Sequence, residues 1–578
     1  MGGLLAYALN RHSPQVGFDF RYFLPRLLDV RLHQLQEGWL QVQWWTPSFG
    51  AGLPAFANPQ HTQFMLAQMF LPVLGPWAAA VAQAAAFNAL GAVLVFWFCR
   101  GRLGYSRAAA LLAGATFGTC GFMWDHALAG HVSFNVFPLV AVIPEALHRA
   151  VPTQRGIALL ALAGAVIVFG GGYSIIIIFA LTCLLLAMLL PLWRPLEFPR
   201  GAVFGRLAAG AVGASMLAAA KVAAVAMFLT RFPRLADGHF KGHAGWEGAS
   251  LLWQMAGRRI FLLLTRWLPY SGDELDGWLG RSDDVGYGPV AIFVLAGAAW
   301  SLHRGFLARH PKGWRLAWWI GGVAAIWLTA EFALGQGLVW PLLQPLPLLR
   351  SLHENQRFAA AFALPLALLV APGWDSLMRG LGPTVIRGAT IMAFVGTIAS
   401  VECFFRNRAS FWYGSYDASL VAESWSQLSR SPDERFVISS VADLPDDASF
   451  LGHASTWKPY EPVFGYGYGG AEFKIRFMPG PIELLAGQPA AWRFHDPRAF
   501  LSSATTLPFT PLSATEETAL RKFLARYQPA WAIPPILQVA WSITIGTGVV
   551  LFALLLLPRH LRSPRLSHSP LPPSADLK

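Results

Sequence analysis

The sequence predicts a mainly α-helical, polytopic membrane protein that carries a small α/β domain outside the bilayer. Two facts of composition and one contrast along the chain predict this class. Of the 578 residues, 55% are hydrophobic and only 13% are charged, and the mean hydropathy is +0.44. A soluble domain would carry roughly 25% charged residues. Long apolar runs fill most of the chain, whereas the segment 404–536 mixes β-branched and aromatic runs with Gly and Pro.

A membrane-spanning helix needs about 20 predominantly apolar residues, and we expect about 11–12 such helices in this chain. The apolar runs that reach or approach this length lie near 77–99, 107–123, 132–147, 156–171, 174–193, 205–228, 287–303, 315–334, 358–374, 385–403 and 537–557. The Gly-Gly-Gly-Tyr turn at 170–173 splits one long run into a tight helical hairpin.

The predicted domains follow from these runs. They are a transmembrane domain over 1–403 that contains the exterior loop 11–76, an exterior α/β domain over 404–536, a last transmembrane helix over 537–557 and a disordered cytoplasmic tail over 558–578. In the exterior domain, the stretch ATEETALRKFLARY is predicted to be a capped helix.

The net charge of +13 is concentrated in every second loop between the apolar runs. Basic loops face the cytoplasm, so the intervening segments are predicted to be exterior. These exterior segments are 11–76, 124–131, 229–286, 335–357 and 404–536. We find no nucleic-acid motif, and the charge therefore indicates orientation and contact with membrane lipids instead of nucleic acid. We also find no Walker A motif, which argues against ATP-driven transport.

This orientation requires an inward-to-outward helix before Asp19. Only MGGLLAYALN precedes it, which is half a span at most. We expect either an abbreviated first helix or an upstream portion that is missing from this start.

Asp19, in GFDFRYFLP, is the first candidate for chemistry. A carboxylate at the membrane face could act as a general base or hold a metal ion near a lipid phosphate. The alternative is an N-cap on an interfacial amphipathic helix. Arg21 could bind a phosphate or cover lipid headgroups. The aromatic loop from Trp44 to Gln60 follows, punctuated by Gly and Pro, and is predicted to support the site or to form an acceptor wall.

Two further places with candidate polar groups are the segment WDHALAGH and Lys221. In WDHALAGH, His131 could approach a phosphate or sugar, and Asp125 and His126 could join a divalent metal site with Asp19, unless the segment is only a polar turn. Lys221 lies inside an apolar run and could neutralise a lipid phosphate, pair with Glu331, or reach the interface by snorkelling.

The segment LPLLRSLHENQRF leads into a predicted span from the exterior side. Its Arg350 and Arg357 could clamp a phosphate leaving group, because guanidinium binds phosphate in a bidentate manner and stays charged. Interfacial anchoring is the alternative for both.

Four motifs in this order resemble the YfhO-type bacterial membrane proteins of the GT-C glycosyltransferase superfamily. They are GFDFRYFLP, then W-x-P-x-x-x-x-G-x-P from Trp45 to Pro54, then Gly130-His131, then P-x-x-x-x-R-x-x-x-x-x-x-R-F ending at Arg357-Phe358. The resemblance spans most of the membrane part, and the order and spacing of the motifs match. The chain departs from the pattern in its short first span and in the intramembrane Lys221.

The resemblance implies a GT-C-like fold and a multi-pass enzyme of the bacterial plasma (inner) membrane. Such an enzyme would move a sugar from a polyprenyl-phosphate donor to a cell-envelope acceptor on the exterior face. Asp19 would be the base or a metal ligand, with Mg²⁺ or Mn²⁺ as the metal. Arg350 and Arg357 would contact the donor phosphate. Two alternatives remain from the residues: a transporter or flippase of lipid-linked saccharide, and a catalytically inactive member of the same fold.

Overall fold

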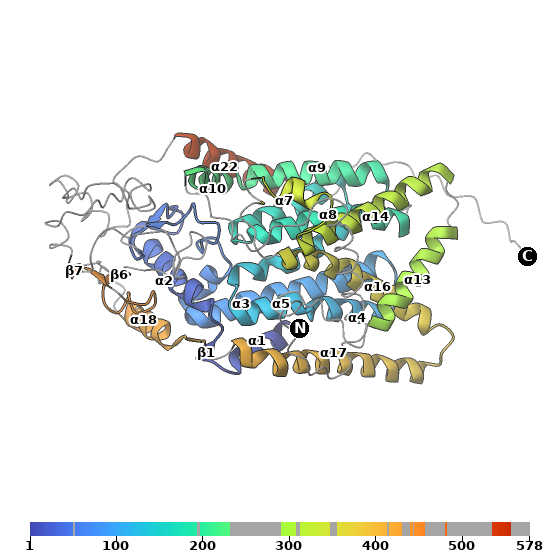
Figure 1. Cartoon of the computed structure of the whole chain (residues 1–578), viewed down its shortest axis with the longest axis horizontal. Coiled ribbons are helices and arrows are strands. Elements are labelled where there is room, and N and C mark those ends of the chain that lie inside the picture. Colours follow the sequence, from blue (N-terminus) through green and yellow to red (C-terminus); the bar gives the residue numbers. More distant parts are fainter. Residues whose placement is uncertain are drawn as a thin grey trace, which may run out of the picture.

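The protein is mainly helical, as the sequence predicts (Figure 1). The computed structural model describes residues 1–49, 53–193, 197–231, 291–307, 312–346, 349, 355–412, 415–430, 440–442, 444–456, 480–481 and 535–556. Arg350, most of the exterior segment 229–286, the predicted helix ATEETALRKFLARY and the tail 558–578 lie outside the described residues.

Most of the longer α-helices run roughly along the long axis of the molecule (Figure 1). They are α1 (Gly2–Asn10), α2 (Phe20–Glu37), α3 (Ala67–Trp97), α4 (Arg107–Gly118), α5 (Gly121–Ala129), α6 (Val142–Leu147), α7 (Thr153–Phe169), α8 (Tyr173–Trp193), α9 (Arg200–Leu217), α10 (Ala219–Arg231), α13 (Ala291–Leu307), α14 (Lys312–Leu334), α15 (Trp340–Leu343), α16 (Ala363–Leu377), α17 (Pro383–Trp412), α18 (Ser419–Arg430) and α22 (Pro535–Leu556). A π-helix, η1 (Phe98–Arg102), extends α3, and two segments are 3-10 helices, η2 (Val132–Ala141) and η6 (Asn355–Phe362).

The strands are short and lie mostly at one end of the molecule (Figure 1). The chain order is β1 (Gln15–Val16), β2 (Trp45–Thr46), β3 (Leu53–Pro54), β4 (Tyr416–Asp417), β5 (Ser440–Ala442), β6 (Ala454–Thr456) and β7 (Gly480–Pro481). β1 pairs antiparallel with β4, and β2 with β3. β5 lies between β6, which is parallel to it, and β7, which is antiparallel.

Four helices of the described residues are long and apolar enough to cross a membrane, and a fifth span results if one bent pair is counted. The four are Ala67–Arg102, Tyr173–Pro191, Arg357–Leu377 and Pro535–Ala553. The chain is therefore a multi-pass membrane protein. Several other predicted spans are shorter apolar helices, such as Thr153–Phe169 and Trp319–Leu334. The hairpin predicted at Gly170–Tyr173 is present, because α7 ends at Phe169 and α8 starts at Tyr173.

Some predicted spans are broken helices. The run 107–123 is split between α4 and α5, which are separated at Thr119 and Cys120. The run 132–147 is ten residues of 3-10 helix followed by the short α6, with Pro138 inside the 3-10 part. The run 205–228 bends by 68° between α9 and α10. Hydropathy does not report these breaks, because an apolar run is equally compatible with one helix or with two short ones.

One further boundary agrees with the sequence prediction, and one differs from it. α1 has nine residues, less than half of a span, and packs closely on α3, since a Cβ on Gly2 would lie 2.4 Å from the Ala85 carbonyl oxygen. α17 continues to Trp412, past the boundary that we expect at residue 403.

Several contacts join segments that the sequence predicts to lie near the same side of the membrane. Arg102 pairs with Glu145 at 2.5 Å, and Arg206 donates to the carbonyls of Ala146 and His148. Arg102, Arg206 and His148 belong to loops predicted to be cytoplasmic, and Glu145 and Ala146 end the predicted span 132–147. Two predicted exterior segments also meet, where Asp19 contacts His131.

The described part of 415–456 is fastened to the N-terminal loop that the sequence predicts to be exterior. Arg26 and Asp446 form a buried ion pair at 3.1 Å, and the Arg26 guanidinium lies 3.8 Å from the Tyr22 ring centroid and 4.4 Å from that of Phe49. The backbone N–H of Thr456 also donates to the Ser48 carbonyl at 3.0 Å. α2 and the exterior segment are thus held as one unit.

The segment around Asp19 and the end of α5 approach each other at two glycines. A Cβ on Gly17 would lie 2.0 Å from the Leu128 carbonyl oxygen. A Cβ on Gly130 would lie 2.3 Å from the Phe20 nitrogen, and Gly130 has a φ of +97° at the end of α5. Glycine permits both the left-handed conformation and the close backbone contact.

Gly130→Ala is expected to destabilise the protein and to separate Asp19 from His131. The left-handed conformation alone costs a non-glycine residue about 1–2 kcal/mol, and the clash with Phe20 adds to this. Gly104→Ala is the matched control, because Gly104 has a φ of +73° with nothing within 4 Å of a Cβ. Thermal unfolding in detergent measures both. Equal losses for the two variants would contradict the close approach.

Candidate functional site

The site is formed where the start of α2 meets the end of α5. The backbone N–H of Asp19 donates to the Ala129 carbonyl at 3.0 Å, which fixes the two segments side by side. Asp19 stands at the N-cap position of α2, but its side chain makes no capping hydrogen bond. Its Oδ2 instead lies 2.5 Å from Nε2 of His131. The Asp19 carboxylate therefore contacts His131 and does not cap its own helix.

A second hydrogen bond continues this contact inward. Nδ1 of His131 lies 2.6 Å from Nδ1 of His126. The side chains of Asp19 and His131 are 23% and 16% exposed, whereas His126 is 1% exposed. Asp19, His131 and His126 thus form a chain of hydrogen bonds that begins at an accessible carboxylate and ends in the core.

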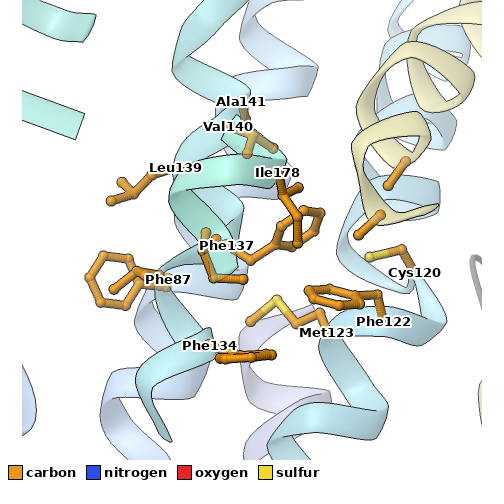
Figure 2. Close-up of a cluster of buried hydrophobic side chains, with 14 of the residues drawn as sticks. Phe87, Cys120, Phe122, Met123, Phe134, Phe137, Leu139, Val140, Ala141 and Ile178 are labelled. Atoms are coloured by element: carbon orange, nitrogen blue, oxygen red, sulfur yellow. The ribbon is translucent and has the colours of Figure 1, made fainter. Parts of the chain in front are cut away.

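Aromatic rings enclose the inner end of this chain. The His126 ring lies edge to face with Phe122 and Phe134, with centroids 4.4 Å and 4.5 Å apart. Figure 2 shows Phe122 and Phe134 within a cluster of buried hydrophobic side chains. The guanidinium of Arg357, from η6, lies 5.0 Å from the centroid of the Phe134 ring. Arg357 and the two histidines therefore all lie against the same Phe134 ring.

The charge state of His126 follows from these surroundings. α5 has nine residues, too few to cross a membrane, and lies outside the candidate spans. Burial lowers the pKa of His126 well below its ordinary value, and the nearby His131 and Arg357 lower it further. His126 is therefore neutral at physiological pH, and one of its ring nitrogens carries no proton.

Of the other predicted phosphate ligands, Arg21 lies near an aromatic ring and Arg350 lies outside the described residues. The Arg21 guanidinium lies 4.8 Å from the Phe18 ring centroid. Burial and Asp447 raise the pKa of Tyr416, and the positive charge of Arg21 acts in the opposite direction. Arg21 is thus close to the exterior segment.

Lys221 is buried and bonded to the backbone of the aromatic loop. Its Nζ donates to the carbonyls of Phe56 and Asn58, at 2.7 Å and 2.6 Å, and the residue is 2% exposed. It is not paired with Glu331, whose carboxylate accepts from backbone N–H groups that include those of Val339 and Trp340. Lys221 fastens the aromatic exterior loop to α10, so the snorkelling and Glu331 alternatives are both wrong.

The predicted metal ligands do not fit a metal ion in this arrangement. No group of three or more His, Cys, Asp or Glu side chains within the described ranges could hold one. Asp19 and His126 contact opposite nitrogens of the same His131 ring, so they cannot converge on one ion. Asp125 is 1% exposed, inside the packed end of α5.

Sequence reasoning missed a buried polar network under the aromatic loop. The Asp29 carboxylate, on α2, accepts from Gln43 Nε2 at 2.8 Å, Thr46 Oγ1 at 2.7 Å and Ser48 Oγ at 2.6 Å. Gln43 Oε1 lies 2.9 Å from Nε2 of His61. The available signal was an acid within the apolar run LLDV of an amphipathic helix, because such an acid must find buried partners.

No known family profile matches the chain, and no curated protein matches it in sequence. Among solved structures, the cryo-EM structure of the arabinofuranosyltransferase AftD from Mycobacteria resembles 70% of this chain at 14% identity and a TM-score of 0.40, and the chain spans 26% of the length of AftD. ArnT from Cupriavidus metallidurans, crystallised bound to undecaprenyl phosphate, resembles 65% of this chain at 16% identity and a TM-score of 0.32, and 76% of ArnT is covered. Likenesses this distant carry no argument about activity, which has to come from the residues of this chain.

Lys221→Met is expected to lower stability, because it leaves the carbonyls of Phe56 and Asn58 without their donor. An unsatisfied buried group costs about 1–3 kcal/mol. Val222→Met is the control, on the same helix at an exposed position. Tryptophan fluorescence during thermal unfolding measures the difference. Normal melting of Lys221→Met together with weaker donor binding would instead restore Lys221 as a phosphate ligand.

The aromatic loop is expected to lose stability as the pH falls. Burial lowers the pKa of His61 well below its ordinary value of about 6.5. At a pH between the lowered pKa of folded His61 and the ordinary pKa of the unfolded residue, only the unfolded residue binds a proton. The free energy of unfolding therefore falls as the pH drops through about 6.5.

His61→Gln is expected to make this pH dependence shallower, and His12→Gln, at an exposed position, is the control. Unfolding temperatures between about pH 5 and pH 8 measure it. The same slope for wild type and His61→Gln would assign the effect to other groups, such as His33, whose pKa burial also lowers.

Proposed function

We propose that this protein is a membrane glycosyltransferase of the GT-C type, related to the YfhO-like proteins. It moves a sugar from a polyprenyl-phosphate donor to a cell-envelope acceptor on the exterior face of the bacterial plasma membrane. One observation carries the proposal. The Asp19 carboxylate does not cap its helix and instead remains partly exposed, held by His131, among the predicted exterior segments.

Asp19 is the general base of this reaction. Its carboxylate takes the proton of the acceptor hydroxyl as the hydroxyl oxygen attacks the anomeric carbon. The bond between that carbon and the phosphate oxygen breaks on the opposite side, and the lipid phosphate leaves with the electron pair. One displacement inverts the configuration at the anomeric carbon.

Arg357 stabilises the leaving phosphate in this proposal. Its guanidinium is near Phe134 and acts electrostatically on His126, so it lies on the same side of the bundle as the base. A positive charge placed before the reaction stabilises the developing anion without further rearrangement. Arg350 and Arg21 join it as the remaining phosphate ligands, and the acceptor is selected by the exterior segment that Arg26 and Asp446 fasten to α2.

The transporter or flippase alternative depended on Lys221 and Glu331 as residues of a translocation path. Both side chains are buried and bonded to nearby backbone groups, so neither supports that alternative. The inactive-scaffold alternative predicts that the Asp19 carboxylate has no effect on turnover.

Asp19→Asn is expected to lower kcat by about 10²- to 10⁴-fold, the contribution of a positioned general base. The amide keeps the size of the side chain but cannot accept the proton. A membrane assay with a labelled polyprenyl-phosphate sugar measures the transfer. Asp417→Asn is the control, since Asp417 is an exposed acid on β4.

Equal transfer by wild type and Asp19→Asn would reject Asp19 as the base. Absence of transfer by the wild type, together with movement of a labelled lipid-linked saccharide across the bilayer, would establish the transporter alternative. Neither transfer nor movement would favour an inactive scaffold.

A further inference from the structure

We propose that His126 is a positioning residue that fixes the ring of His131, so that Nε2–H of His131 donates to the Asp19 carboxylate. This inference rests on the proposed function of Asp19. It adds a buried residue that does not touch the substrate, and it replaces the metal-ligand role that the sequence suggests for His126.

The first step concerns the proton between the two rings. Nδ1 of His126 and Nδ1 of His131 are 2.6 Å apart, so one nitrogen must donate and the other must accept. The Nε2 of His131 is 2.5 Å from a carboxylate oxygen, which can only accept when it is ionised. Nε2 of a neutral His131 therefore carries the proton, and its Nδ1 accepts from Nδ1–H of His126.

The second step concerns the other nitrogen of His126. With Nδ1 protonated, Nε2 of the neutral ring carries no proton. This atom is buried and has no hydrogen-bond partner among the described residues. This tautomer leaves Nε2 as a buried acceptor without a partner, which has its own cost. The tautomer is therefore set by the contact between the two Nδ1 atoms.

The third step concerns what holds His126 still. Its ring is flanked by Phe122 and Phe134 at interplanar angles of 77° and 69°. Gly130 begins the turn that returns the chain to His131, and the His131 N–H donates to the His126 carbonyl at 2.9 Å. A side chain confined in this way can fix the orientation of its partner, as residues behind a functional histidine do.

The function of this arrangement is to present the base. His131 alone, with a partly exposed side chain, could turn about its own bonds and release Asp19. The bond to His126 removes that freedom. Loss of His126 should therefore lower kcat, while the KM for the donor, which depends on the phosphate ligands, should change little.

The experiment compares three substitutions of His126 in the full-length protein. His126→Phe preserves an aromatic ring and removes the donor. His126→Asn places an amide N–H near the position of Nδ1, and His126→Gln places it near the position of Nε2. We expect His126→Phe and His126→Gln to lower kcat by roughly 10- to 100-fold, and His126→Asn to recover most of the activity. The donor KM should stay within about twofold of wild type.

Three outcomes would overturn the inference. They are unchanged kcat in His126→Phe, equal loss in His126→Asn and His126→Phe, or a loss that follows melting temperature across the three variants. The failure of the proposed function looks different, because Asp19→Asn would then transfer sugar like wild type. Histidine ¹⁵N NMR gives a test without activity: wild type should show a neutral His126 protonated at Nδ1, and protonation at Nε2 would reject the mechanism.

Discussion

The site depends on one close backbone contact, the approach of the Asp19 segment to the end of α5. The Asp19 N–H bonds to the Ala129 carbonyl, and glycine occupies both positions where a side chain would collide. Everything polar in the site depends on this contact, because the Asp19 carboxylate can meet His131 only if the two backbones are side by side. A hydrogen bond between side chains of 2.5 Å tolerates little displacement of its partners.

The rest of the exterior loop is held by polar groups that are buried and paired. Asp29 accepts three side-chain hydrogen bonds, Lys221 donates to two carbonyls, and Arg26 pairs with Asp446. A loop that is mostly aromatic residues, Gly and Pro has few regular backbone hydrogen bonds, so these side chains supply the missing partners. Charged residues that resemble ligand-binding groups in the sequence can therefore serve instead to hold a loop in place.

The sequence predicted the helical membrane class and the hairpin at Gly170–Tyr173, because both depend on local hydropathy and on glycine. It also assigned Asp19, His131 and Arg357 to one compartment through the alternation of basic loops, and in the structure His131 contacts Asp19 while both His131 and Arg357 lie against Phe134. It could not predict the partners of Lys221. A buried amine bonds to whichever carbonyl groups the tertiary fold supplies, and the carbonyls of Phe56 and Asn58 are about 160 positions away in the chain.

The broken helices are also beyond a hydropathy argument, and some of them lie at the site. α5 is separated from α4 by the break at Thr119 and Cys120, η2 starts at the residue after His131, and η6 contains Arg357. Irregular backbone within a membrane protein persists only where protein or a water-filled cavity shields it from lipid, because lipid satisfies no hydrogen bonds. α5 ends two residues before His131, and η6 carries Arg357, so that side chains from separate segments converge. Continuous spans would have carried His126, His131 and Arg357 on helices that run past one another. Interrupting those spans is therefore what allows this apolar chain to assemble a polar site.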